Sequence, residues 1–506
     1  MPGFSSATLL AEQIRTGQYS VAALADLYLA RIQKYNAALN AVVTCDPFAV
    51  RELAREMDQR LAAGEPPGPL FGVPITIKDS FATAGMRTTS SYLPLKDYLP
   101  DTDATAVARL RAAGALILGK TNLPELAGDP QCWSPVFGRA NNPWRLDCTP
   151  GGSTGGGAAA LAAGLTALDL GSDIGGSIRL PAHFCGVYGL KPTENRVPRT
   201  GHIPDLPQAP RLVRHASCFG PLARSVDDLK LVLGLIAGAD GIDCEVPPVL
   251  PQREPLRPIG PTLRIAMWQD LGLPLAQDVR QVLAHTRSEL QAAGHQVEMV
   301  CPEGFDPQRL WHAYGVLLGN EMGQGMPWLQ RLLLPRLAPL LPKTDYIVRG
   351  VARGLRFDSR DLSWALNVRD DWLRSLEQML QHYDAWLLPV SATAAFAHAP
   401  VSPNRPPPLL LVDDQPTPYF MATIAHCSLL SLSGSPVVSL PAGRSADGLP
   451  IGVQLVGRKW HDEALLDVAA VVDAVLPGFI APPDYQSADK SVTALRASLA
   501  PNLALA

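Results

Sequence analysis

The sequence contains no long apolar run. Nowhere in the 506 residues do about 18 apolar residues follow one another, the length that a helix needs to span a bilayer. Near the N-terminus, Glu12 and Arg15 stand where the apolar centre of a secretory signal peptide would lie. We therefore expect a cytoplasmic protein without a membrane-spanning helix.

Residues that bind metals show no ligand spacing. The eight cysteines are far apart with no CxxC pair, and the ten histidines form no HExxH pattern. Scattered cysteines in a long chain are typical of free thiols in a reducing compartment. We expect no metal and no other cofactor.

Neither sign of charge dominates the composition. The chain has 43 Lys and Arg residues against 47 Asp and Glu residues, a formal net charge of −4. This balance gives no electrostatic reason to expect nucleic acid as a partner. With 47% hydrophobic and 18% charged residues, the chain is typical of a globular protein with a substantial core.

Segments with helical periodicity alternate with short β-rich segments. Ser20 is a typical N-cap, and apolar residues at helical spacing follow it as far as Tyr35. This alternation predicts an α/β protein built on a layered sheet. Further helices are predicted at residues 103–113, 158–163 and 276–293, and strands at residues 72–77, 115–118, 166–170, 263–268 and 296–300.

Two proline-rich stretches, residues 247–261 and 400–418, predict long loops. Strands before and after the first stretch are compatible with one shared sheet. We therefore predict a single domain over about residues 1–480, followed by a C-terminal tail at 481–506.

Three glycine motifs match known patterns only in form. Residues 114–121 satisfy the Walker A pattern, but Ala, Leu, Ile and Leu occupy its middle and belong in a buried strand. Residues 155–160 match a loose dinucleotide fingerprint without a preceding strand. Residues 151–155 fit the nucleophile elbow G-x-S-x-G, although Pro150 makes the segment before them a poor strand. An esterase of the α/β-hydrolase type with Ser153 as nucleophile stays an alternative.

The most informative block is residues 149–193, which holds two glycine-rich turns that each carry a serine. Ser153 and Ser177 are separated by a predicted helix and strand, and Ser-Ile-Arg-Leu-Pro follows Gly176. A lone Gly-Gly-Ser is usually a flexible linker, but two such turns around a helix–strand pair indicate a site.

At these residues the chain resembles the amidase-signature family, which includes bacterial amidases, fatty acid amide hydrolases and the glutamyl-tRNA amidotransferase catalytic subunit. The resemblance implies a large twisted mixed β-sheet covered by helices on both faces. It also implies a signature core at about 72–226 and a variable substrate-side region at about 245–430. Further landmarks lie at residues 72–79, 119–125, 220–226, 383–389, 434–441 and 448–454.

The resemblance implies an amidase with a Ser-Ser-Lys triad. By position, Ser177 matches the family's nucleophile, Ser153 its bridging serine, preceded by a cis peptide bond, and Lys78 its base. The chemistry is consistent, because a serine hydroxyl needs an adjacent base and a buried neutral lysine can replace histidine. Backbone N–H groups of four successive residues would stabilise the oxyanion: Ile174, Gly175, Gly176 and Ser177.

Neighbouring polar residues are expected to have structural tasks. Thr154 is expected to cap the following helix, Arg179 to pair with Asp173, and His183 to be a core or supporting histidine. A catalytically inactive binding homologue is the alternative from another functional class, but Lys78, Ser153 and Ser177 are all present.

Two segments bear on the kind of substrate. Residues 123–128 lack the acidic stretch that is typical of the amidotransferase, which favours a free-standing hydrolase. Residues 327–343 are apolar and punctuated by Arg331, Arg336 and Lys343, like the membrane cap of fatty acid amide hydrolases. The same segment is also compatible with core packing or a homodimer face. We expect a small-molecule amide substrate, hydrophobic if this segment forms its portal.

Overall fold

The computed structural model describes residues 2–203, 205–207, 211–248, 260, 262–400 and 407–486. Its centre is one mixed sheet of eleven strands, in the order β1-β3-β2-β6-β8-β7-β14-β15-β11-β9-β10. The strands are β1 (Val42–Thr44), β2 (Pro74–Lys78), β3 (Leu116–Thr121), β6 (Leu168–Asp173), β7 (Tyr188–Lys191), β8 (Cys218–Ala223), β9 (Arg264–Met267), β10 (Gln296–Met299), β11 (Ala385–Pro389), β14 (Val437–Arg444) and β15 (Pro450–Val456).

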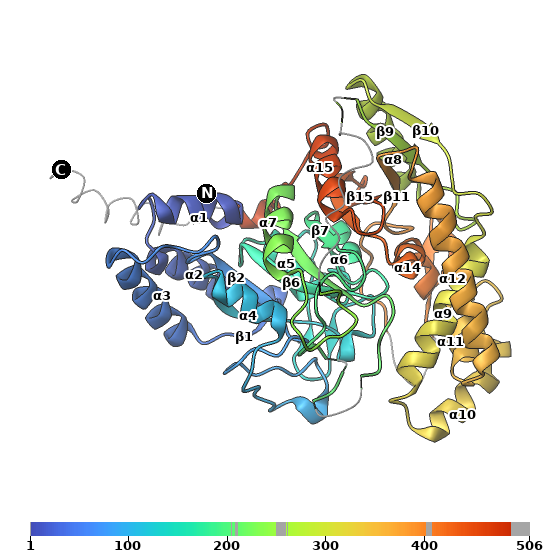
Figure 1. Cartoon of the computed structure of the whole chain (residues 1–506), viewed down its shortest axis with the longest axis horizontal. Coiled ribbons are helices and arrows are strands. Elements are labelled where there is room, and N and C mark those ends of the chain that lie inside the picture. The colour runs from blue at the N-terminus through green and yellow to red at the C-terminus, as the bar shows by residue number, and fades with distance from the viewer. Residues whose placement is uncertain are drawn as a thin grey trace.

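Helices cover both faces of this sheet, and the predicted α/β fold is confirmed (Figure 1). No helix in the described residues is long and apolar enough to cross a membrane. The helices are α1 (Ala7–Arg15), α2 (Val21–Leu39), α3 (Pro47–Ala62), α4 (Thr105–Ala112), α5 (Gly155–Ala162), α6 (Arg179–Cys185), α7 (Val226–Ile236), α8 (Gln277–Ala292), α9 (Pro307–Gly323), α10 (Trp328–Leu337), α11 (Tyr346–Gly354), α12 (Ser359–Met379), α13 (Tyr419–Thr423), α14 (Ala425–Ser433) and α15 (Asp462–Asp473).

Strands from both halves of the sequence share the sheet. β2 pairs in parallel with β3 on one side and β6 on the other, whereas β9, β10 and β11 extend the far end. Because β2 has a partner on each side and helices above and below, all five of its residues are buried. The site described below lies at the carboxyl end of this central strand.

Helices α9, α11 and α12 form a group of their own at the right of Figure 1, with α10 at its lower end. Buried indole N–H groups anchor this group to the rest of the molecule. Trp311 on α9 donates to the carbonyl of Ala425 at 2.8 Å, and Trp372 on α12 donates to that of Leu429 at 2.9 Å. Both carbonyls belong to α14, so α9 and α12 are fixed against that helix.

Glycines allow α9 and α11 to approach each other closely. A Cβ added at Gly315 would lie 2.2 Å from the carbonyl oxygen of Ile347, and one at Gly350 would lie 2.4 Å from that of His312. Such distances are sterically forbidden, so only glycine fits here. The close contact holds the two helices as one unit, which forms a wall of the cavity described below.

The predicted elements are all present, with boundaries shifted by a few residues. The Ser20 hydroxyl caps α2 by accepting from the N–H of Ala23 at 3.1 Å, as expected. The short helix predicted at 158–163 begins earlier, at Gly155, and its first glycines lie against other parts of the chain. A Cβ at Gly156 would lie 2.4 Å from the N of Asn122.

The two predicted loops differ in outcome. Most of residues 247–261 lies outside the described residues, as does most of the tail at 481–506. Residues 400–418 are not only loop, because the described part holds a hairpin of β12 (Leu409–Val412) and β13 (Gln415–Pro418). Proline ends β13, where a missing N–H is tolerated.

Candidate active site

Lys78 is the last residue of β2 and is fully buried. Its Nζ lies 2.6 Å from Oγ of Ser153 and 2.9 Å from Oγ of Ser172. Burial lowers the pKa of Lys78 to about 7, although the charges of Asp169 and Asp173 act in the opposite direction. A lysine of this kind is neutral in a large fraction of molecules at neutral pH, when it can accept a proton.

Asp169 on β6 lies close to this lysine but is itself held in an apolar environment. Burial raises the pKa of Asp169 to about 7, although the hydroxyls of Thr76 and Thr121 donate to its carboxylate at 2.7 and 3.0 Å. The strand end therefore combines a lysine and a carboxyl group that burial shifts toward their neutral forms.

The two serine turns converge on the end of β2. Ser153 is buried in the turn before α5, and the Gly152–Ser153 peptide bond is cis. Ser177 is partly exposed, in the loop between β6 and α6. The N–H of Thr154 donates to the carbonyl oxygen of Ser177 at 3.0 Å, which joins the two turns directly.

A buried ion pair holds the Ser177 loop. Asp173 accepts from Nε and Nη2 of Arg179 at 3.0 and 2.8 Å, as the sequence predicts. Burial would raise the pKa of Asp173, but the charge and hydrogen bonds of Arg179 outweigh it and lower the pKa to about 2. The same carboxylate accepts from the backbone N–H groups of Gly176 at 2.8 Å and Ile178 at 3.1 Å.

This contact changes the predicted set of oxyanion donors. The N–H of Gly176 points to Asp173 and is not free to bind an oxyanion. Among the described residues, the N–H groups of Ile174, Gly175 and Ser177 make no such contact, so these three remain candidates.

Thr154 and His183 lie next to the site, and both have structural roles. Thr154 occupies the N-cap position of α5, as expected, but its hydroxyl makes no cap bond. The hydroxyl instead donates to the carbonyl of Ser172 at 3.3 Å, because Gly171 leaves room for it against β6. His183 is a buried core histidine, whose Nδ1 accepts from the N–H of Gly452 at 2.7 Å.

The Walker A and nucleophile-elbow patterns do not form the structures that those motifs require. Lys120 of the Walker A pattern is buried in β3, and its Nζ lies 2.5 Å from the carbonyl oxygen of Phe81 and 2.8 Å from Oγ1 of Thr88. Residues 149–153, all of them described, form no strand before the G-x-S-x-G turn.

A family model described as Amidase matches residues 23–466 of the chain. The chain belongs to the amidase-signature family. A glutamyl-tRNA(Gln) amidotransferase subunit from Roseiflexus sp. (strain RS-1) is 33% identical, over 94% of this chain and 96% of that protein. Among solved structures, 6-aminohexanoate cyclic dimer hydrolase with its substrate has a TM-score of 0.78 at 26% identity, covering 96% of this chain and 100% of that one. A bacterial aryl acylamidase has a TM-score of 0.78 at 25% identity, covering 94% and 96%.

The similarity to an amidotransferase subunit bears on the sequence-based preference for a free-standing hydrolase. That preference rests on residues 123–128, which depart from the stretch typical of the amidotransferase. Since the identity to such a subunit extends over nearly the whole chain, the departure does not by itself separate the two activities.

A large apolar cavity opens beside Ser177 of this amidase-family chain. Its volume is about 320 Å³, and Gly152, Ile174 and Gly175 lie on its wall together with Ser177. The opposite wall comes from α9, α11 and α13, with side chains that include Leu318, Met322, Ile347, Val351 and Phe420. Periodicity alone marks these residues as helical but does not show that they face the signature turns.

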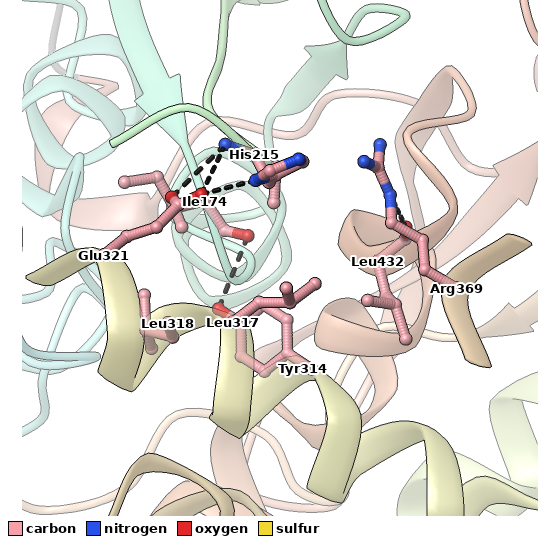
Figure 2. Close-up of a pocket in the computed structure, with 9 residues that line it drawn as sticks. Ile174, His215, Tyr314, Leu317, Leu318, Glu321, Arg369 and Leu432 are labelled. Atoms are coloured by element: carbon pink, nitrogen blue, oxygen red, sulfur yellow. Dashed lines mark hydrogen bonds and ion pairs between the residues drawn. The ribbon is translucent and has the colours of Figure 1, made fainter. Parts of the chain in front are cut away.

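A second, much smaller cavity shares the lining residues Ile174, Tyr314 and Leu318 with the first (Figure 2). Tyr314 lines both cavities, and its hydroxyl donates to the carbonyl oxygen of Ile174 at 3.4 Å. Figure 2 shows His215 hydrogen-bonded to Glu321, with Arg369 on the other side of the cavity. The sequence did not predict Tyr314 as a residue of this site. An aromatic residue on a helix is usually a core residue, and no motif surrounds this one.

The apolar segment at residues 327–343 is largely exposed. It contains α10, where the side chains of Trp328 and Leu333 are 68% and 49% exposed, and Leu340 beyond it is 81% exposed. The segment is therefore not part of the core of this chain. It follows α9, whose last residues line the large cavity.

Proposed function

We propose that this chain hydrolyses carboxylic amides to an acid and an amine or ammonia, through an acyl-enzyme on Ser177. The observation that carries the proposal is the 2.6 Å contact between Nζ of Lys78 and Oγ of Ser153, at a buried lysine whose pKa is about 7. Ser177 is joined to the Ser153 turn and opens onto a cavity.

Acylation begins with neutral Lys78. As Oγ of Ser177 attacks the amide carbonyl carbon, its proton passes to Ser153, and the proton of Ser153 passes to Lys78. We assign stabilisation of the oxyanion to the N–H groups of Ile174, Gly175 and Ser177. When the C–N bond breaks, Ser153 gives a proton to the leaving nitrogen and recovers one from Lys78, so the lysine is neutral again.

Deacylation repeats this proton path with water as the nucleophile. Water attacks the ester carbonyl of acylated Ser177 and loses a proton, through Ser153, to Lys78. The ester C–O bond then breaks, and Ser177 recovers a proton along the same path while the acid leaves. Asp173 takes no proton in either half, since its pair with Arg179 keeps it ionised.

The cavity supports an apolar acyl group as the substrate class. Its walls are mostly aliphatic side chains, and burial of each CH₂ group contributes about 0.8 kcal/mol. Exposed α10 next to this cavity supports a further proposal: that residues 327–343 contact a membrane surface, or a second copy of the chain, near the substrate entrance.

A second candidate function is favoured by one comparison. The 33% identity to a glutamyl-tRNA(Gln) amidotransferase subunit is compatible with a chain that passes amide nitrogen to another acceptor. The two candidates separate when the purified chain alone is given primary amides and free ammonia is measured. Full turnover by the chain on its own supports the hydrolase, and turnover that needs a partner supports the amidotransferase.

A fluorophosphonate probe that reacts with activated serines tests the proposed nucleophile. We expect wild-type chain to be labelled at Ser177 and Ser177→Ala to lose both the label and turnover. Label at Ser153 would favour the esterase alternative. A wild-type chain that takes no label and cleaves no amide would favour the inactive binding homologue.

A further inference from the structure

Asp129 is the one ionisable acid or base among the described residues that line the large cavity, apart from the phenol of Tyr314. The remaining lining is apolar side chains, glycine backbone and the hydroxyl groups of Ser177 and Tyr314. A carboxylate in such a wall loses hydration, and burial raises the pKa of Asp129. Among these described lining residues, Asp129 is therefore the one carboxyl group that a ligand in the cavity could meet.

The contacts of Asp129 use one of its two oxygens. Oδ1 accepts from the hydroxyl of Tyr419 at 2.6 Å and from the N–H of Gln131 at 2.7 Å. In the described part of the chain, neither a hydrogen bond nor an ion pair reaches Oδ2. Oδ2 is not fully buried, and Asp129 lines the cavity.

Asp129 lies at the catalytic end of the cavity. A Cβ added at Gly152 would be 2.3 Å from the carbonyl oxygen of Asp129 and 2.8 Å from that of Gln131. Gly152 precedes Ser153, and the next residue, Thr154, is hydrogen-bonded to Ser177. The backbone of Asp129 therefore lies against the turn that carries Ser153, and Asp129 lines the same cavity as Ser177.

We propose that Asp129 is a specificity-determining residue whose Oδ2 binds an ammonium or N–H donor a few bonds from the scissile amide. The inference rests on the proposed function and narrows its substrate class. The preferred substrates are amides with an apolar body and an amino group close to the reacting carbonyl. An ammonium group would restore the hydrogen bonding that the apolar wall denies to this carboxylate.

A purely structural role for Asp129 makes a different prediction. Both observed contacts go to Oδ1, and the Oδ1 of an asparagine accepts from Tyr419 and Gln131 in the same way. Asp129→Asn therefore keeps the turn and removes the negative charge from the cavity. The variant separates recognition from folding.

The experiment measures binding by calorimetry in a Ser177→Ala background, where no turnover occurs. One pair of probes is phenylalanine amide and 3-phenylpropionamide, which differ by an amino group on the acyl side. The other pair is N-(2-aminoethyl)-3-phenylpropionamide and N-propyl-3-phenylpropionamide, which differ on the leaving side. We expect the amino member of one pair to bind about 10- to 100-fold more tightly, and Asp129→Asn to abolish that preference. The probe pair whose affinities differ shows whether the amino group that Asp129 binds lies on the acyl side or on the leaving side of the substrate.

Glu125→Gln is the matched control, since Glu125 is exposed on the same segment but does not line the cavity. It should leave the preference unchanged, and thermal unfolding should show that both variants are folded. Equal affinities within both pairs, binding of none of the four amides, or a uniform loss across all four in Asp129→Asn would overturn the inference. If the amino member still binds more tightly but the wild-type chain hydrolyses none of the four amides, the proposed function is overturned and the inference about Asp129 stands.

Discussion

The Nζ of Lys78 lies 2.6 Å from Oγ of Ser153, although 75 positions separate the two residues in the sequence. Lys78 ends β2, and Ser153 lies in the turn directly before α5. Ser153 is in turn tied to the Ser177 loop through Thr154. A single strand end thus brings together Lys78, the hydroxyl of Ser153 and the loop of Ser177.

The relay makes a prediction about Ser153→Ala. Without its hydroxyl no proton passes between Ser177 and Lys78, so kcat should fall by about 10²- to 10⁴-fold, the usual size of general acid–base catalysis. Ser177 is retained, so slow covalent labelling by the fluorophosphonate probe should persist, as mass spectrometry of the labelled peptide would detect. Ser172→Ala is the matched control, because it removes the other hydroxyl at Lys78 but not the proposed relay. Similar losses in both variants would contradict the relay.

The shifted pKa of Lys78 makes a prediction about pH. The base acts when neutral, and burial lowers its pKa to about 7. We expect kcat/KM to rise about tenfold per pH unit below pH 7 and to level off above it. Lys78→Ala should abolish this rise together with most of the activity. A rise that levels off only near pH 10, the usual range of lysine, would mean that Lys78 is not desolvated in the working enzyme.

The Asp173–Arg179 pair makes a prediction about stability. Asp173→Asn leaves the fully buried guanidinium of Arg179 without its charge partner, so the free energy of unfolding should fall by about 3–5 kcal/mol. Urea unfolding followed by circular dichroism measures this loss. Asp97→Asn, at an aspartate with an 81% exposed side chain, should change the same free energy by less than about 0.5 kcal/mol. If both variants change the free energy of unfolding by the same small amount, the Asp173–Arg179 pair is exposed to solvent.

The exposed segment at residues 327–343 makes a prediction about substrate length. If it forms a portal, replacing Trp328 and Leu332 with serine should weaken long-chain amides and binding to liposomes far more than it affects acetamides. Each buried CH₂ contributes about 0.8 kcal/mol, so wild-type affinity should rise with chain length until the cavity is full.

The control is Leu411→Ser, at a leucine that is 68% exposed on β12. It should leave both chain-length preference and liposome binding unchanged. Equal losses for all chain lengths in the Trp328 and Leu332 variant would count against a portal. A concentration-dependent change of molecular mass without liposome binding would favour the dimer face.

The sequence by itself determined the local elements and the chemistry-bearing turns. Apolar periodicity and caps predicted α2, α4, α8 and the central strands, because these signals depend on near neighbours in the chain. Lys78, Ser153 and Ser177 became candidate residues by position, through the resemblance to the amidase-signature family that the serine turns and the lysine strand carry. The Arg179–Asp173 pair was also predicted, since its two residues are six positions apart.

Tertiary structure alone decided which distant side chains come into contact and which hydrogen-bond donors already have an acceptor. The hydroxyl of Thr154 at the N-cap of α5 bonds to β6, its N–H bonds to the Ser177 loop, and Gly176 gives its N–H to Asp173. The cavity joins Asp129 and Ser177 to helices far along the chain, and its apolar wall leaves one carboxylate oxygen accessible. Periodicity gives the face that a helix buries but not the partner on that face, so these contacts follow from packing and not from the local sequence.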